Sequence, residues 1–133
     1  MAYLGIHHLG FAVDDLDEAV ATYERLFGAT VEERAAGEGL RGANVLVGGG
    51  RIELLAADDP DTPIGRFLAS RGPGMHHIAY AVGDVASELE ALRSTGAQPI
   101  DEQPRIGLFG HPIAFVQPDS VHGVLTELVE AHG

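Results

Sequence analysis

The 133-residue sequence contains no cysteine and no lysine. Without cysteine the chain forms no disulfide and offers no thiolate, so a metal ion would have to bind to His, Asp or Glu. Arginine supplies every basic side chain, and the formal net charge is −12 at pH 7. An acidic surface of this kind repels nucleic acid and anionic membranes at long range, which argues against both as partners.

Long apolar runs are also absent, because no stretch approaches the length that spans a membrane. The N-terminus lacks a basic region followed by an apolar run, so we expect a cytoplasmic protein. Hydrophobic residues make up 45% of the chain, which is ordinary for a globular protein of this length. The sequence therefore predicts a single domain covering residues 1–133.

One pattern is present twice, at residues 6–13 and 75–82. Each copy runs apolar, His-His, apolar, small, aromatic, Ala, Val. After each copy come a short acidic break and an amphipathic helical pattern that ends on a glycine, Gly28 in the first copy and Gly96 in the second. A repeat of this kind predicts an internally duplicated domain with a pseudo-twofold axis.

Each half of the chain has the pattern of a βαβββ module. In the first half we expect a helix with Asp15 as its N-cap, a flexible loop or a frayed strand start at 35–42, and strands at 4–13, 29–34, 44–47 and 51–55. In the second half we expect a helix from Val85 to Gly96, a loop at 105–112, and strands at 75–82, 98–101, 113–116 and 124–129. Module one then covers 4–57, a connecting segment with a short helix that Thr62 caps covers 58–74, and module two covers 75–131.

Each module places one histidine early in its first strand and one glutamate in its last strand. The pairs are His8 with Glu53 and His77 with Glu127. A glutamate in an apolar strand is costly to bury unless it is paired or bound to a metal. Two imidazoles and two carboxylates suit zinc, cobalt, nickel, manganese or ferrous iron, so we predict that these four residues bind one divalent ion.

The remaining histidines have a simpler interpretation. His7 and His76 alternate away from their neighbours along the strand, so we assign them packing or supporting roles. We do not expect His111, His122 or His132 to bind the metal. The apolar residues Tyr23 and Phe27 recur at helical spacing and are predicted core residues.

The sequence resembles the vicinal oxygen chelate (glyoxalase/bleomycin resistance) superfamily, and within it the methylmalonyl-CoA epimerases. The resemblance extends from Ile6 to Val129 and is most specific at residues 52–55, 61–64, 74–79, 101–105 and 123–128. It implies an α+β fold in which two tandem βαβββ modules pair into a curved, eight-stranded, half-open barrel with the helices outside. The metal ligands of the family fall on His8, Glu53, His77 and Glu127, and the resemblance makes Glu127 a catalytic carboxylate as well.

The resemblance implies an isomerase that interconverts (R)- and (S)-methylmalonyl-CoA, or a similar 2-substituted malonyl-type thioester, through a metal-stabilised enolate. It also implies one divalent ion (cobalt, zinc, manganese or nickel), an acyl-CoA substrate and a homodimer. Arg41, Arg66, Arg71 and Arg105 are candidates for CoA phosphate contacts. Some relatives carry a glutamate where this chain has Gly42, which leaves the second acid/base unassigned. The alternatives are a glyoxalase I-like lyase and a non-catalytic binding or resistance protein of the same fold.

Overall fold

The structure is a computed structural model that describes residues 2–131. The chain divides into two compact units. The first unit is His8–His76, and the second unit consists of the described residues up to His7 together with those from His77 onward. No helix among residues 2–131 is long and apolar enough to cross a membrane.

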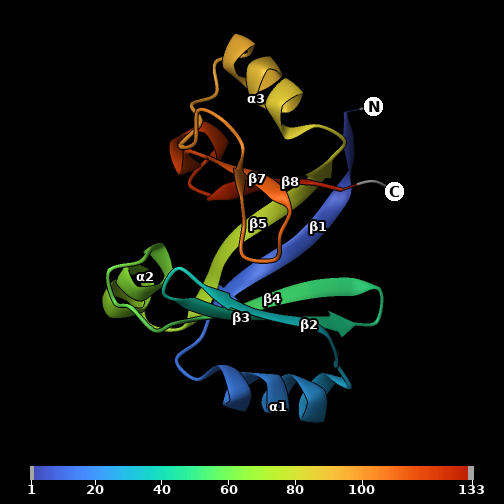
Figure 1. Ribbon diagram of the computed structural model, residues 1–133, viewed down its shortest axis with the longest axis vertical. Coiled ribbons are helices and arrows are strands. Elements are labelled where there is room, and N and C mark those ends of the chain that lie inside the picture. The colour runs from blue at the N-terminus through green and yellow to red at the C-terminus, as the bar shows by residue number, and fades with distance from the viewer. Residues whose placement is uncertain (1, 132–133) are drawn as a thin grey trace. The chain divides into compact units, whose positions relative to one another are not determined.

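The first unit holds one helix packed on strands, followed by a shorter helix. Its elements are β1 (Tyr3–Ala12, which begins in the second unit), α1 (Leu16–Phe27), β2 (Thr30–Gly37), β3 (Leu40–Val47), β4 (Gly50–Ala57) and α2 (Pro63–Arg71). β1 is parallel to β4, and β4, β3 and β2 are antiparallel neighbours. Figure 1 shows α1 on one face of these strands.

The ends of α1 follow the predicted capping. The Asp15 carboxylate accepts a hydrogen bond of 3.0 Å from the backbone N–H of Glu18, and Gly28 ends the helix with a left-handed φ of 64°. The inner face of α1 carries Leu16 and Val20, which are buried in a cluster with Leu54 and other apolar side chains of β3 and β4. This packing fixes which face of β4 turns toward the helix.

Of the two interpretations of residues 35–42, the flexible loop is wrong and the strand start is closer to the structure. β2 continues to Gly37 and β3 begins at Leu40, so only Glu38 and Gly39 form the turn between them. Both residues have positive φ, 54° and 80°, which is the conformation that two-residue hairpin turns favour. The glycines that suggested flexibility instead make a tight hairpin.

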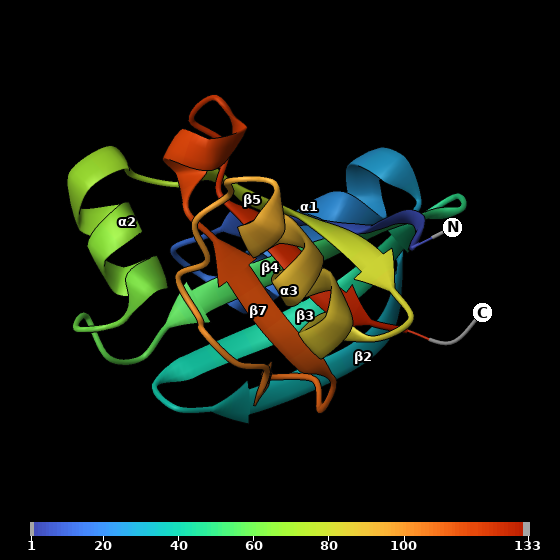
Figure 2. The ribbon, with the colours of Figure 1, turned by 90° about the horizontal axis from the view of Figure 1, so that it is seen from above.

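The second unit repeats the plan with shorter elements. They are β5 (Gly74–Val82, which begins in the first unit), α3 (Val85–Ser94), β6 (Arg105–Ile106), β7 (Pro112–Val116), a 3-10 turn at Pro118–Val121 and β8 (Thr126–Glu130). β5 is parallel to β8, and β8, β7 and β6 are antiparallel neighbours. Figure 2 shows α3 lying over β7 and β8, against which Leu89 is buried.

Both modules therefore have the predicted βαβββ order, and the eight strands are ordered β2-β3-β4-β1-β5-β8-β7-β6. The predicted strand at 98–101 is wrong, since that segment contributes only an isolated bridge between Pro99 and Val116. Proline has no N–H to donate to a ladder, which limits pairing there. The segment 105–112, expected as a loop, contains the short β6, and β8 begins at Thr126 rather than at Val124.

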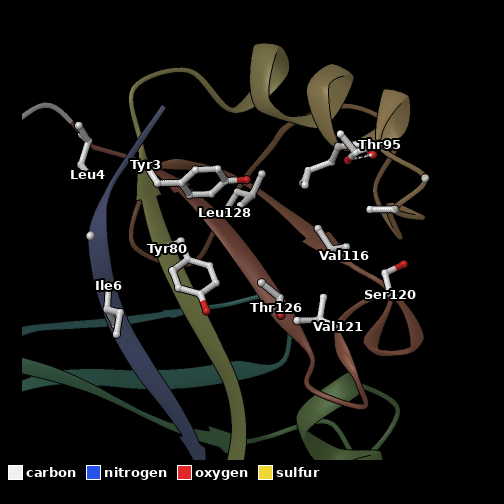
Figure 3. A pocket seen from close by; sticks show the side chains of 14 residues that line it. Tyr3, Leu4, Ile6, Tyr80, Thr95, Val116, Ser120, Val121, Thr126 and Leu128 are labelled. Atoms are coloured by element: carbon white, nitrogen blue, oxygen red, sulfur yellow. Dashed lines mark hydrogen bonds between the residues drawn. The ribbon is translucent and has the colours of Figure 1, made fainter. Parts of the chain in front are cut away.

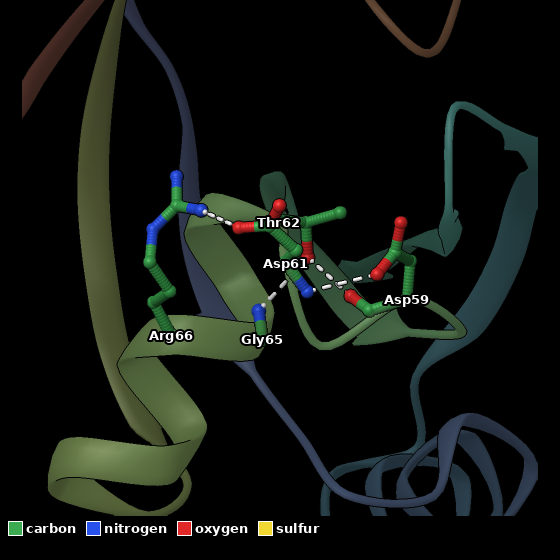
Figure 4. Close-up of polar contacts among 5 residues, drawn as sticks. All are labelled: Asp59, Asp61, Thr62, Gly65 and Arg66. Atoms are coloured by element: carbon green, nitrogen blue, oxygen red, sulfur yellow. Dashed lines mark hydrogen bonds and ion pairs between the residues drawn. The ribbon is translucent and has the colours of Figure 1, made fainter.

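The start of α2 is held by a compact set of hydrogen bonds (Figure 4). The Thr62 hydroxyl donates to the Asp59 carbonyl at 2.8 Å and accepts from the Gly65 N–H at 3.0 Å. Arg66 donates to the Asp61 carboxylate at 2.8 Å. The connecting segment thus forms an N-terminal cap of α2, because Thr62 is buried and its hydroxyl both donates and accepts a hydrogen bond.

Gly65 has no room for a side chain. A Cβ atom at this position would lie 2.5 Å from the Pro60 carbonyl oxygen and 2.7 Å from its carbonyl carbon. These atoms belong to the backbone, so relief requires that the cap itself move. We predict that Gly65→Ala lowers the free energy of unfolding by about 1–3 kcal/mol in urea titrations. Gly83→Ala, where no atom lies within 4 Å of the added Cβ, is the control; equal stability of the two variants would contradict the prediction.

Candidate functional site

The first unit brings His8 together with Glu53. Alternation along β1 turns Leu9 and Phe11 away from the face that carries His8. Glu53 lies on the neighbouring strand β4, in register with Gly10. His8 Nε2 is 3.6 Å from Glu53 Oε1, and the two residues are only 4% and 9% exposed. A buried imidazole and a buried carboxylate thus share one face of the sheet.

The second unit brings His77 together with Glu127 in the same way. Glu127 lies on β8, in register with Ala79 of β5. His77 Nε2 is 3.2 Å from Glu127 Oε1, and both residues are at most 5% exposed. The Phe115 ring packs edge-to-face against the His77 ring, with 5.5 Å between centroids. Phe115 thereby limits the orientations that His77 can adopt.

These pairs have the chemistry and spacing of metal ligands. Nitrogen and oxygen ligands lie about 2.0–2.2 Å from a zinc-type ion, so two adjacent ligands are about 3.0–3.4 Å apart. The pair in the second unit falls within that range, and the pair in the first unit is slightly wider. His8, His77 and Glu127 are buried candidate ligands, and Glu53 is slightly more exposed than these three. The residues present therefore fit a divalent ion.

Sequence reasoning missed Asn44. This residue lies on β3, in register with Glu53 on β4, so its side chain shares the face that carries Glu53. Asn44 is 5% exposed, and its Oδ1 atom has no hydrogen-bond partner among residues 2–131. Gly42, two residues earlier on the same face, contributes no side chain. The pairing of Asn44 with Glu53 across two antiparallel strands is the signal that could have identified it. An asparagine at the start of the predicted strand 44–47 carries no chemical signature of its own.

The other histidines make ring contacts away from these pairs. His7 lies edge-on to His111 with 6.2 Å between centroids, and His76 packs on Phe67 at 5.1 Å. These contacts agree with the packing roles expected for His7 and His76. His122 follows the 3-10 turn with a positive φ of 54°, and His132 lies outside the described residues.

The four arginines considered for CoA phosphates are engaged within their own units. Arg41 donates to Asp58 at 2.8 Å, and Arg66 donates to Asp61 at 2.8 Å. Arg105 donates to Asp101 at 3.1 Å and lies over the Phe115 ring. Arg71 lies over the Phe67 ring, 5.6 Å from its centroid. All are at the surface, where such pairs contribute little stability, so each can exchange its partner for a ligand at low cost.

A separate cavity of about 770 Å³ lies on the α3 side of the second unit (Figure 3). Its walls are mostly apolar. They include Leu92 of α3 together with Tyr80 and Leu128, which alternate away from the face of His77 and Glu127 on β5 and β8. Tyr3 borders it and packs edge-on against Tyr80. Burial raises the pKa of Tyr3, and the charge of Glu88 adds to the shift. No His or acidic side chain among the described residues lines this cavity, so we assign the chemistry to the other face.

Comparisons with known proteins agree with this geometry. Residues 7–115 match the model of the glyoxalase/bleomycin resistance protein/dioxygenase superfamily. The chain is 35% identical to the uncharacterized protein YqjC of Bacillus subtilis, covering 96% of this chain and 93% of that protein. It is 33% identical to human mitochondrial methylmalonyl-CoA epimerase, covering 95% and 73%.

A solved structure gives the same result. The crystal structure of methylmalonyl-CoA epimerase from Mycobacterium tuberculosis matches with a TM-score of 0.93 and 34% identity, covering 99% of this chain and 91% of that one. The chain therefore belongs to the glyoxalase/bleomycin resistance protein/dioxygenase superfamily, and the predicted α+β fold class is confirmed. Within that superfamily it is an isomerase of the epimerase type.

Asp101 fixes the strand that carries Phe115. Its carboxylate accepts from the Phe115 backbone N–H at 2.9 Å and from Arg105 at 3.1 Å. We predict that Asp101→Ala lowers the free energy of unfolding by about 1–2 kcal/mol, because a partly buried N–H loses its acceptor. Asp61→Ala, which removes an exposed ion pair, should change stability by less than about 0.5 kcal/mol. Chemical denaturation measures both, and an equal effect of the two would refute the role of Asp101.

Proposed function

We propose that this chain interconverts the (R) and (S) forms of methylmalonyl-CoA or of a similar 2-substituted malonyl-type thioester. One observation carries the proposal: each unit buries a His–Glu pair at equivalent register in a chain that resembles methylmalonyl-CoA epimerases over nearly its full length. The acyl-CoA substrate follows from the names of those relatives. We also retain as proposals a single domain, a homodimer and a cytoplasmic location.

We further propose that His8, Glu53, His77 and Glu127 together bind one divalent ion. Two neutral imidazoles and two carboxylates match the charge of cobalt, zinc, manganese or nickel, and their burial excludes competing water. Such an ion, when bound, supplies positive charge to the carboxylate and thioester oxygens of the substrate. The absence of cysteine leaves no thiolate in the chain to compete for it.

In the proposed reaction Glu127 moves the proton at C2. That carbon lies between a thioester and a carboxylate, so removal of its proton leaves a planar enolate. The Glu127 carboxylate takes the proton on one face, and a proton that solvent water delivers to the opposite face inverts the centre. Glu127 then releases its proton to solvent, which neutralises the hydroxide left by that water. Gly42 has no side chain to offer there. Phe115 packs on His77, which holds the Glu127 side of the site rigid during the transfer.

Two alternatives remain. The second candidate is a glyoxalase I-like lyase, which this chain resembles in its two-His, two-Glu donor set. The lyase reaction also moves a proton next to a carbonyl. A non-catalytic binding or resistance protein of the same fold is the third. The three differ in the reaction they perform: an epimerase exchanges the C2 proton of a malonyl-type thioester, a lyase converts a glutathione hemithioacetal, and a binding protein does neither.

The proposal is tested by proton NMR of (R)-methylmalonyl-CoA in deuterated water. Protein loaded with cobalt should replace the C2 proton with deuterium and produce the (S) form. Glu127→Gln should lower the exchange rate by about 10²–10⁴-fold, the usual size of a general-base contribution. Exposed Glu90→Gln is the matched control and should leave the rate unchanged. Absence of exchange with the loaded wild-type protein would refute the epimerase. In a separate assay with methylglyoxal and glutathione, formation of lactoylglutathione would favour the lyase.

A further inference from the structure

Asn44 is a polar side chain that the fold does not satisfy. It is 5% exposed, and its Oδ1 atom is buried without a hydrogen-bond partner in the described part of the chain. Leaving such an acceptor unpaired in a buried position is destabilising. A single unpaired acceptor in a strand calls for a hydrogen-bond donor that residues 2–131 do not supply.

The fold itself does not require an amide at this position. In the second module the equivalent place, in register with Glu127, is occupied by Phe115. Phe115 has no polar side-chain atom and packs on His77. Since one module is built with an apolar side chain opposite its glutamate, the polar side chain in the other module is a property of the site and not of the architecture.

The surroundings of Asn44 leave its amide next to Glu53. Side chains directly opposite on antiparallel strands have Cβ atoms about 4.5–5.5 Å apart, so Asn44 borders Glu53. Gly42 on the same strand and Gly10 in register with Glu53 add no side chains to this face. If a malonyl-type group binds with its two chelating oxygens beside Glu53, the substituent on its C2 is therefore within reach of Asn44 Oδ1.

We propose that Asn44 determines substrate specificity by accepting a hydrogen bond from a hydroxyl on C2 of the bound malonyl-type group. This inference rests on the proposed function and, within its range of 2-substituted malonyl-type thioesters, names the 2-hydroxylated ones as those that Asn44 favours. An ionised malonyl group presents only acceptors through its oxygens, so within the substrate the C2 substituent is the group that can supply a donor. A methyl group would leave Oδ1 unpaired, whereas a hydroxyl of similar size satisfies it.

Calorimetric titration with two small diacids tests the proposal. Hydroxymalonate and methylmalonate differ at C2 by a hydroxyl in place of a methyl group. For cobalt-loaded protein, we expect Asn44→Leu to weaken hydroxymalonate binding about tenfold while methylmalonate binding stays within about twofold. Asn44→Asp keeps an acceptor at the same place, and its ratio of the two dissociation constants should stay close to that of the wild type. Because hydroxymalonate can also chelate cobalt through its hydroxyl, the change of this ratio between variants is the decisive quantity.

A purely structural role predicts a different result. If Asn44→Leu weakens the binding of both diacids equally, or of neither, the inference is overturned. It is also overturned if the ratio of the two dissociation constants for Asn44→Asp departs from that of the wild type. The cobalt content and thermal unfolding of each variant show whether the fold and the metal are retained. Exchange of the C2 proton of methylmalonyl-CoA is measured separately, so a failed epimerase with an intact hydroxyl preference is distinguished from an epimerase in which Asn44 plays no part.

Discussion

The structure depends on two carboxylates that are buried inside apolar strands. Glu53 and Glu127 lie among leucines and valines on β4 and β8, where an isolated charge would be costly. Each is placed within 3.6 Å of a histidine from the parallel strand beside it. The register of β1 with β4 and of β5 with β8, the small residues Gly10 and Ala79, and the helices on the opposite face all serve this placement.

The duplication preserves the His–Glu pairs and varies what surrounds them. Asn44 and Phe115 occupy equivalent register positions. Asn44 has an amide oxygen without a hydrogen-bond partner among residues 2–131, and Phe115 has an aromatic ring against a histidine. The helices differ as well. Tyr23 of α1 packs against the apolar core of its unit, whereas Leu92 in α3 borders a cavity. The prediction that Phe27 is a core residue is wrong, because it is 57% exposed at the end of α1. A duplicated fold thus supplies symmetric charge, and the departures from symmetry can supply selectivity.

The repeat, the capping residues and the strand alternation were enough to predict the βαβββ order and both His–Glu pairs, because these depend on local patterns. The hairpin at Glu38-Gly39 was missed because glycine suits a loop and a tight turn equally well. Pro99 belongs to a segment predicted as a strand that the ladder accommodates only as a bridge. Asn44 was missed because its meaning comes from register with Glu53 and from the lack of a partner, and neither is visible in the sequence.

The central claim is that the two His–Glu pairs serve one ion. Titration of the metal-free protein with cobalt, followed by elemental analysis of the dialysed complex, tests it most directly. The account predicts one ion per chain, with loss of that ion when either His8 or His77 is replaced by alanine. Two ions per chain, each lost with only one of the two histidines, would show that the pairs bind separately and would contradict the account.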